Sequence, residues 1–271
     1  MTSSVRSARV RAARALAKRA LRERSRQFLA EGPQAVREAL RYRRLNELFV
    51  TGPARSRHAG LVYAADAAGV PVHEVSGEVM AELAQTVTPQ GVLAVCPFID
   101  VPVGTLVASR PRLVVVLANV RDPGNAGTVL RTADAAGAGG VIFAASSVDP
   151  YNSKCVRSSA GSLFHLPLVT GIPVSEAVSS LRDVGLTVLA ADGRATLGLD
   201  LLDHDRRLAR PTAWLFGNEA WGLPDELVAL ADEAVAVPIY GQAESLNLAA
   251  AAAVCLYASA RAQDGGAAEA G

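Results

Sequence analysis

The sequence predicts an α/β protein of two domains, the second built on a mainly parallel sheet. Stretches typical of strands and of helices alternate along most of the 271 residues, as they do in α/β folds. The apolar run RLVVVLANV at 112–120 is typical of a parallel strand that is buried on both faces. Prolines and glycines punctuate 97–111 just before it, which indicates a linker between the two domains.

The first domain is predicted over residues 1–100. A basic helix at 6–27 leads into a short strand at 28–29, and Gly32-Pro33 forms a turn from which a helix starts at Pro33. Further along, the apolar pattern predicts strands at 45–51, 70–75 and 91–98, and helices at 58–69 and 77–85. This alternation indicates a small α/β domain.

The second domain is predicted over residues 112–262, after a linker at 101–111. A last helix at 246–260 carries almost no polar side chain, so we expect it to be covered on nearly all sides, by its own domain or by a second subunit. The tail at 263–271 is predicted to be disordered. The other strands are expected at 112–120, 140–144, 166–169, 186–190, 213–216 and 234–238, and the other helices at 126–136, 152–159, 174–184 and 224–231.

Composition excludes several classes of protein. No apolar run approaches the length of a membrane span, and no apolar core follows the basic N-terminus as a secretory signal would require. The three cysteines, Cys96, Cys155 and Cys255, lie far apart and outside the spacings of metal ligands. They therefore indicate neither a disulfide framework nor a zinc site, and we expect a reducing, cytoplasmic location.

Charge is distributed unevenly along the chain. Residues 1–57 contain 15 Lys and Arg against 4 Asp and Glu, whereas the remainder contains 12 against 22. Nearly all of the cations are arginines, whose planar fork suits phosphate. This clustering predicts contact with a polyanion, although a solvated basic helix without a partner is the alternative interpretation.

Three polar, glycine-bearing segments are expected at the carboxyl ends of strands, where open parallel sheets bind their ligands. They are NVRDPGNAGTVLRTADAAG at 119–137, LFGNEAWGL at 215–223, and PIYGQAESLNLAAAAAVCLY at 238–257. In the third segment, Ser245 is predicted to cap the N-terminus of the last helix, with Asn247 inside the first turn. Each segment alone is a weak signal, because such turns occur throughout α/β proteins.

Together, in this order and spacing, the segments closely resemble the three signature motifs of the SpoU/TrmH family of RNA ribose 2′-O-methyltransferases. The resemblance covers residues 112–261. The N-terminal stretch RSRQFLAEGPQAVREAL is similar to that family's small substrate-binding domain, which resembles RNA-binding ribosomal proteins. The resemblance implies S-adenosylmethionine as methyl donor, a homodimer formed through the C-terminal domain, and a SPOUT fold with a deep trefoil knot. General topology rules argue against threaded chains, so periodicity does not predict the knot.

The resemblance also implies which residues act. Asn125 and Arg131 match the first motif, Glu219 the second, and Ser245 and Asn247 the third. Arg131 is expected to activate the ribose hydroxyl with the help of a substrate phosphate, or to position that phosphate and stabilise the emerging alkoxide. A free arginine is a poor base, so both roles stay open. Asn125, Ser245 and Asn247 are expected to orient substrate or donor by hydrogen bonds, and Glu219 to hold Arg131 or a loop rather than to act as a base.

The methyl donor is expected against the second and third motif loops, held largely by backbone groups. An apolar, glycine-lined slot suits adenine and the alkyl arms of the sulfonium, and methyl transfer to a hydroxyl needs no metal. The first candidates for donor binding are Gly217, Val237 and Leu246, and the further candidates are Leu189, Ala190, Asn218 and Ile239.

The region at 151–167 is similar to the segment between the family's motifs. Lys154 and Arg157 are expected either to touch RNA phosphate or to be surface charges. Packing roles are predicted for Cys155, His165 and Trp214, and also for Trp221, for which stacking on a base is the second interpretation.

The function predicted from the sequence is S-adenosylmethionine-dependent methylation of a ribose 2′-hydroxyl in structured RNA. Ribosomal RNA is favoured, as an rRNA-processing step, because the separate basic domain sets this chain apart from family members that act on transfer RNA. Transfer RNA is the alternative substrate. A non-catalytic RNA-binding or ribosome-assembly factor is the alternative of another class, and the retention of all five motif residues counts against it.

Overall fold

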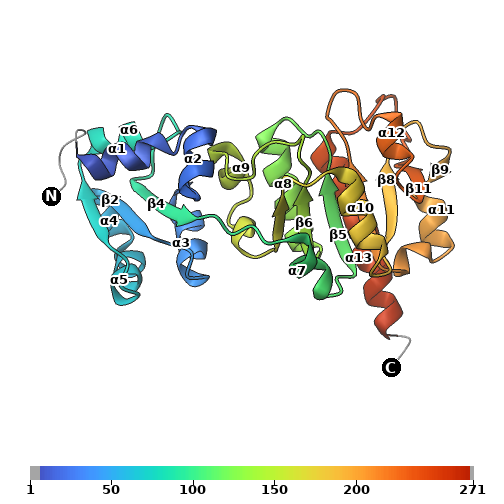
Figure 1. Ribbon diagram of the computed structural model, residues 1–271, viewed down its shortest axis with the longest axis horizontal. Coiled ribbons are helices and arrows are strands. Elements are labelled where there is room, and N and C mark those ends of the chain that lie inside the picture. The colour runs from blue at the N-terminus through green and yellow to red at the C-terminus, as the bar shows by residue number, and fades with distance from the viewer. Residues whose placement is uncertain (1–6, 269–271) are drawn as a thin grey trace. The chain divides into compact units, whose positions relative to one another are not determined.

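The computed structural model describes residues 7–268, which form two compact units (Figure 1). Unit 1 runs up to Ile99 and also includes Asp149–His165, whereas unit 2 comprises Asp100–Val148 and the chain from Leu166 onward. The segment Asp149–His165 therefore packs with the N-terminal part of the chain, although it lies inside the range predicted for the second domain.

Unit 1 is built on a four-stranded sheet in the order β1-β4-β2-β3, in which β4 is antiparallel to both of its neighbours and β2 is parallel to β3. All four strands and the Pro33 helix start were predicted. The elements are α1 (Ala8–Ala15), α2 (Arg19–Ser25), β1 (Gln27–Glu31), α3 (Pro33–Arg41), β2 (Glu47–Thr51), α4 (Gly52–Arg57), α5 (Ala59–Ala67), β3 (Val72–Val75), α6 (Gly77–Leu83), β4 (Val92–Pro97) and α9 (Ser153–Ser158).

The predicted basic helix at 6–27 is two helices rather than one, and Arg6 lies outside the described residues. The break between α1 and α2 is stabilised by Arg22, whose Nη1 donates to the carbonyls of Leu16 (2.9 Å) and Ala17 (3.0 Å). These carbonyls follow the end of α1 and would otherwise lack a partner. The sequence pattern could not show this, because the satisfying group comes from the following helix.

The same guanidinium explains why Asp149–His165 joins unit 1. Arg22 is only 4% exposed, and its Nη2 lies 2.6 Å from Oδ2 of Asp149. A buried ion pair with further hydrogen bonds is costly to break, since either charge alone would be left without a partner. Aromatic packing adds to the attachment, because the Phe28 ring lies 4.8 Å from that of Tyr151 and 6.0 Å from that of Phe164.

Unit 2 contains a seven-stranded sheet, entirely parallel, in the order β7-β6-β5-β10-β8-β11-β9. The sequence predicted a mainly parallel sheet but missed β9 and α11. The elements are α7 (Val103–Ala108), β5 (Leu113–Leu117), α8 (Pro123–Ala135), β6 (Gly140–Phe143), β7 (Leu168–Thr170), α10 (Val174–Arg182), β8 (Thr187–Ala191), β9 (Leu197–Gly198), α11 (Leu199–His204), β10 (Thr212–Phe216), α12 (Asp225–Val228), β11 (Glu233–Ala236) and α13 (Leu248–Ala268).

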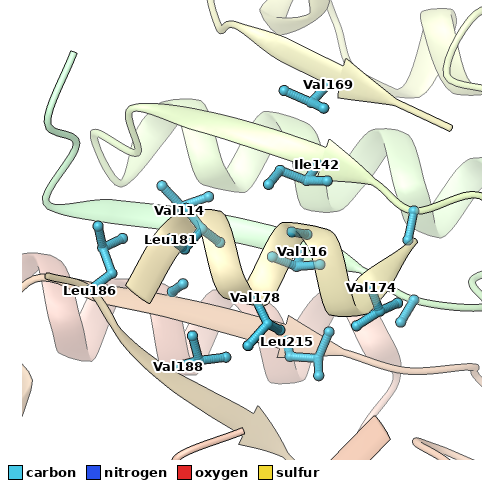
Figure 2. Close-up of a cluster of buried hydrophobic side chains, with 14 of the residues drawn as sticks. Val114, Val116, Ile142, Val169, Val174, Val178, Leu181, Leu186, Val188 and Leu215 are labelled. Atoms are coloured by element: carbon cyan, nitrogen blue, oxygen red, sulfur yellow. The ribbon is translucent and has the colours of Figure 1, made fainter. Parts of the chain in front are cut away.

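Helices cover both faces of this sheet. On one face, α10 buries Val178 and Leu181 against Val114 and Leu215 of the central strands (Figure 2). On the other face, α8 and α13 pack together, and Trp214 of β10 is fully buried with its Nε1 donating to Ser259 of α13 (2.9 Å). Burial on both faces is what the continuous apolar run of β5 predicted.

The stretch predicted as a linker at 101–111 contains the helix α7, which belongs to unit 2. Leu106 is fully buried in the core that α10 also covers. Gly140 leaves room for it, since a Cβ at that position would lie 2.4 Å from Leu106 Cδ1. The prolines at 97–111 thus mark the ends of a short packed helix as well as a connection between domains.

The last helix differs from the prediction at both ends. It begins at Leu248, and its cap is Asn247, whose Oδ1 accepts from the N–H of Ala249 (2.8 Å). The prediction that Ser245 is the cap is therefore wrong, because Asn caps equally well and stands next to the helix start. Helix continues through Ala268, into the tail predicted to be disordered, where Gln263 donates to the carbonyls of Arg112 and Arg210. Residues 269–271 lie outside the described range.

The sides of this helix are not all covered within one chain. Val254 is 43% exposed and Tyr257 54% exposed, whereas Ala252, Cys255 and Leu256 on the opposite face are fully buried. All three cysteines are free and buried, and burial raises the pKa of Cys255 to about 12. Within residues 7–268, no helix has both the length and the apolar character that crossing a membrane requires.

Candidate active site

The loops that follow β5, β8, β10 and β11 all lie at the carboxyl-terminal end of the unit 2 sheet, because its strands are all parallel. Ligands of open parallel sheets bind at this end, near helix N-termini. Three of these loops contain the polar segments singled out in the sequence. The fourth, which follows β8, was not predicted to take part.

The first loop leads from β5 into α8. Asp122 caps this helix, since its Oδ1 accepts from the N–H of Asn125 (2.8 Å), and Pro123 occupies the first helical position. Asn119 has a φ of 59°, in the left-handed region where asparagine is tolerated better than most side chains. Asn125 is therefore placed in the first turn of α8, with its side chain free to meet the other loops.

Glu219, from the loop after β10, holds the first loop in place. Its carboxylate accepts from the backbone N–H groups of Arg121 (3.3 Å) and Asp122 (3.1 Å), and from Nδ2 of Asn125 (3.4 Å). Backbone amides at a helix start are favourable partners for a carboxylate. Of the two roles expected for Glu219, the geometry is that of a residue holding a loop.

Asn125 connects this arrangement to the third loop. Its Oδ1 accepts from Nδ2 of Asn247 at 3.2 Å. The side chains of Glu219, Asn125 and Asn247 thus form one hydrogen-bonded chain across three loops that are far apart in the sequence. Since Asn247 also caps α13, the starts of two helices are tied to the same network.

The loop after β10 is rigidly built. Asn218 and Gly222 exchange two backbone hydrogen bonds (2.9 and 3.0 Å), and the Asn218 side chain donates to the carbonyl of Asn119 (2.9 Å) and accepts from the N–H of Ala220 (2.8 Å). Gly222 has a φ of 70°, which favours glycine. A Cβ on Gly217 would lie 2.4 Å from the backbone of Gly222, so only glycine fits there.

These loops enclose a cavity of about 230 Å³. Phe216, Val235 and Leu248 contribute buried apolar surface, and Gly217, Gly193 and Gly222 bring backbone close to the space. Such a mixture suits a ligand with a flat apolar ring and polar arms. The residues that line the cavity are Ala191, Asp192, Gly193, Phe216, Gly217, Asn218, Glu219, Ala220, Gly222, Val235, Val237, Ile239, Glu244, Ser245, Leu246, Leu248 and Ala251.

Five of the seven residues expected to bind a donor line this cavity, namely Gly217, Asn218, Val237, Ile239 and Leu246. Leu189 and Ala190 do not, because they lie inside β8 and are buried in the sheet. The next residues along reach the cavity instead, namely Ala191 at the end of the strand and Asp192 and Gly193 in the loop after it. The Asp-Gly pair directly after a predicted strand was the signal that would have found them.

Asp192 forms part of the cavity wall, and its carboxylate accepts hydrogen bonds from Arg194. The guanidinium makes paired hydrogen bonds to the Asp192 carboxylate, including Nη2 to Oδ2 at 2.9 Å, and also donates to the carbonyl of Leu223 (3.0 Å). These bonds to Arg194 lower the pKa of the Asp192 carboxyl. Arg194 thereby ties the loop after β8 to the loop after β10.

The remaining two motif residues are exposed. Ser245 lines the cavity mouth without a side-chain hydrogen bond among the described residues. Arg131 lies on the exposed face of α8, two turns beyond the start of the helix, and forms no hydrogen bond or ion pair within residues 7–268. The structure therefore brings Asn125, Glu219 and Asn247 together and leaves the Arg131 guanidinium accessible to a ligand.

The other residues singled out in the sequence lie elsewhere. Cys155 is buried, and His165 is half-buried with its Nε2 3.2 Å from Oε2 of Glu38, as expected of packing residues. Arg157 pairs with Glu31 at 3.4 Å, and Lys154 is exposed. Within the described range, no group of three or more His, Cys, Asp or Glu is placed to hold a metal ion.

Fold and site together define a class: an open parallel α/β domain with a cofactor-sized cavity at the carboxyl edge of its strands, joined to a small α/β domain. Residues 112–257 match the SpoU rRNA Methylase family, and residues 7–94 match the MRM3-like substrate binding domain. The chain belongs to the SpoU rRNA methylase family.

Similar proteins agree with this assignment. A Synechocystis protein described as an uncharacterized tRNA/rRNA methyltransferase is 36% identical, over 88% of this chain and 85% of its own length. The 23S rRNA (guanosine(2553)-2′-O)-methyltransferase RlmP of Bacillus subtilis is 33% identical, over 85% of this chain and 87% of its own. The crystal structure of an AdoMet-bound rRNA methyltransferase from Sinorhizobium meliloti superposes with a TM-score of 0.79 at 29% identity, covering 96% of this chain and 97% of that one.

Proposed function

We propose that this protein transfers a methyl group from S-adenosylmethionine to a ribose 2′-hydroxyl in structured RNA, most favourably large-subunit ribosomal RNA. The observation that carries the proposal is the hydrogen-bonded chain of Glu219, Asn125 and Asn247, which joins three loops around one cavity. Membership of the SpoU family and the rRNA methyltransferases among its relatives support the reaction and the substrate class.

The donor binds in the cavity at the sheet edge. When bound, S-adenosylmethionine supplies an electrophilic methyl group on a sulfonium that leaves as a neutral thioether. Phe216, Val235 and Val237 offer apolar surface to its adenine, and backbone groups around Gly217 and Gly193 meet its polar arms. Leu246 and Ile239 add apolar surface to the cavity, and Leu189 and Ala190, buried in β8, directly precede Ala191 of its wall.

The residues around the cavity act on the ribose. Arg131, without a partner among the described residues, binds a phosphate of the RNA. As the 2′-hydroxyl gives its proton to that phosphate or to solvent, the guanidinium stabilises the negative charge that develops on the ribose oxygen. Asn125 and Asn247 hold each other's amides in fixed orientations, and Glu219 fixes the loop that carries Asn125. Ser245 at the cavity mouth donates to or accepts from the incoming nucleotide. Positioning of this kind accounts for a large part of the acceleration.

Unit 1 delivers the RNA through the arginines at the end of α3, which we call the α3 cluster: Arg37, Arg41, Arg43 and Arg44. Apart from a 3.9 Å pair between Arg41 and Glu38, these side chains have no ion pair among residues 7–268. The arginines of the N-terminal helices differ, since most of them are already paired: Arg9 with Glu47 (3.2 Å), Arg14 with Glu82 (2.8 Å), Arg19 with Glu23 (2.7 Å) and Arg22 with Asp149 (2.6 Å).

Replacing Arg37, Arg41 and Arg44 together by Ala should weaken RNA binding. The slope of log Kd against log salt concentration should fall by about three, one unit for each lost phosphate contact. The control removes the same charge from paired positions, with Arg9, Arg14 and Arg19 each changed to Ala. Filter binding of unmodified 23S rRNA at several salt concentrations measures both slopes. Equal losses in the two triple variants would contradict a specific role for the α3 cluster.

The proposal includes a homodimer formed through the C-terminal domain. A groove of about 740 Å³ runs along α13 and α11, where Tyr240 is 90% exposed and Tyr257 54% exposed. Leu246 and Val237 line both this groove and the donor cavity, so a second subunit seated there would border the site. Exposed apolar side chains gathered in one groove are typical of subunit contacts.

Changing Tyr257 to Glu should convert the dimer to monomer, with dimer dissociation raised by about 100-fold or more, because the interface would bury an unpaired carboxylate. Sedimentation equilibrium of the purified protein measures the change. Tyr63 of α5 is 76% exposed and serves as the control, since Tyr63→Glu adds the same charge in unit 1. Dissociation by both variants, or by neither, would speak against this interface.

Two further features belong to the proposal. The family resemblance predicts that the last segment is threaded through an earlier loop as a trefoil knot. A reducing cytoplasm, where rRNA is processed, is the expected location, in keeping with three free, buried cysteines.

Methyl transfer to purified RNA tests the proposed function. The protein is incubated with S-adenosylmethionine labelled in the methyl group and with unmodified ribosomal or transfer RNA, each transcribed in vitro. Label in ribosomal RNA is the expected result. Label only in transfer RNA would favour the alternative substrate, and the absence of label from both, together with RNA binding, would favour a non-catalytic RNA-binding or ribosome-assembly factor.

A further inference from the structure

Trp221 is the more unusual of the two tryptophans in this protein. Trp214 is fully buried, whereas Trp221 is 61% exposed, so the packing role that the sequence favoured for Trp221 is wrong. Among residues 7–268 its indole makes no hydrogen bond and no contact with another aromatic ring. An exposed indole offers a large apolar face that is available to a partner outside this chain.

The loop that carries Trp221 holds it in a fixed place. The two backbone hydrogen bonds between Asn218 and Gly222 close a tight turn around it, and Gly217 packs directly on Gly222. At its ends the loop is anchored by Phe216 and Leu223, both of which are 1% exposed. A rigid aromatic side chain loses little conformational entropy when it binds a partner.

The position of this turn relates Trp221 to the donor cavity. Ala220 and Gly222, on either side of it, line the cavity, whereas Trp221 does not. The indole therefore stands outside the cavity at its rim, two residues from Glu219, whose carboxylate holds the loop of Arg121 and Asp122. The exposed Arg121 adds positive charge at the same edge.

We propose that Trp221 is a stacking platform for an unpaired nucleobase of the RNA, at or next to the methylated nucleotide. Proteins that read RNA commonly stack unstacked bases on aromatic side chains, and every base presents a π-face for this purpose. Holding one base at the rim positions its ribose, or the neighbouring ribose, beside the methyl donor. The inference rests on the proposed function, because it requires RNA as substrate.

Trp221→Ala should raise the KM for RNA by about tenfold, the effect of losing one base-stacking contact, while the Kd for S-adenosylmethionine changes by less than about twofold. Trp221→Phe should retain most of the RNA affinity, since a phenyl ring can still stack. This comparison separates stacking from a general effect on the loop, because the two variants remove the same indole N–H.

Tryptophan fluorescence gives a readout that does not depend on activity. Because Trp214 is buried, the emission of solvent-exposed tryptophan comes from Trp221. Adding unmodified 23S rRNA, transcribed in vitro, should quench this component in the wild type, and the quenching should be lost in Trp221→Phe.

Each failure has its own meaning. If wild-type protein binds the RNA without quenching, or if Trp221→Ala binds and methylates it as well as wild type, Trp221 does not stack on a base. If the exposed emission instead changes on dilution of the protein without RNA, the indole lies against a second copy of this chain. If the wild type binds no RNA, the proposed function itself fails.

Discussion

We expect Arg131→Ala to abolish methyl transfer, with kcat falling about 10³-fold or more, while the Kd for S-adenosylmethionine changes by less than about twofold. The first effect is expected because the variant loses the group that stabilises charge on the ribose oxygen. The second follows because Arg131 is not among the residues that line the cavity proposed to hold the donor. Single-turnover methylation and calorimetric donor binding measure the two quantities separately.

Arg131→Lys refines the test. A lysine keeps the charge but not the planar fork that binds phosphate through two hydrogen bonds, so we expect it to recover only a small part of the lost rate. Loss of donor affinity in Arg131→Ala would contradict the assigned role, because it would place the guanidinium against the donor rather than against the RNA.

Gly217→Ala is the second change with a large expected effect. The new methyl group would lie 2.4 Å from the carbonyl carbon and oxygen of Gly222 and 2.6 Å from the nitrogen of Leu223, so the loop must move. Backbone cannot yield as a flexible side chain does, and a misplacement of about 1 Å in an active site can cost about 100-fold in rate. We therefore expect the Kd for S-adenosylmethionine to rise by about 100-fold, measured by calorimetry.

Gly241→Ala is the matched control for this substitution. Gly241 lies in the neighbouring loop after β11, with no heavy atom within 4 Å of an added Cβ and no positive φ. Its donor affinity should stay within about twofold of the wild type. Donor binding by Gly217→Ala that equals that of the control would show that the close approach of Gly217 and Gly222 does not shape the site.

Much of the fold could be predicted because the strands are strongly apolar and regularly spaced. The run at 112–120 identified β5, and the Gly-Pro pair at 32–33 marked the start of α3. The misses involve contacts between distant segments. The break between α1 and α2 depends on Arg22, and the attachment of Asp149–His165 to unit 1 depends on the same guanidinium, which no local pattern reveals.

In the candidate site, too, some residues could be predicted from local sequence signals and others could not. Residues of the predicted polar loops, such as Gly217 and Leu246, line the cavity, because glycine turns and helix starts have recognisable sequence signals. The two strand residues Leu189 and Ala190 do not line it, since placing a strand end by one or two residues exceeds what a sequence pattern can do. The Asp-Gly pair marks Asp192 as a loop residue, but its place in the cavity wall depends on the neighbouring strand β11.

The position of the methyl group on the RNA decides whether the protein methylates the ribose. RNA labelled by the enzyme is hydrolysed in alkali, which cleaves the chain through the free 2′-hydroxyl of each nucleotide. A methyl group on that oxygen removes the internal nucleophile and leaves an alkali-resistant dinucleotide. We expect the label to be recovered in such dinucleotides. Label recovered in mononucleotides would place the methyl group on a base and would contradict transfer to the ribose.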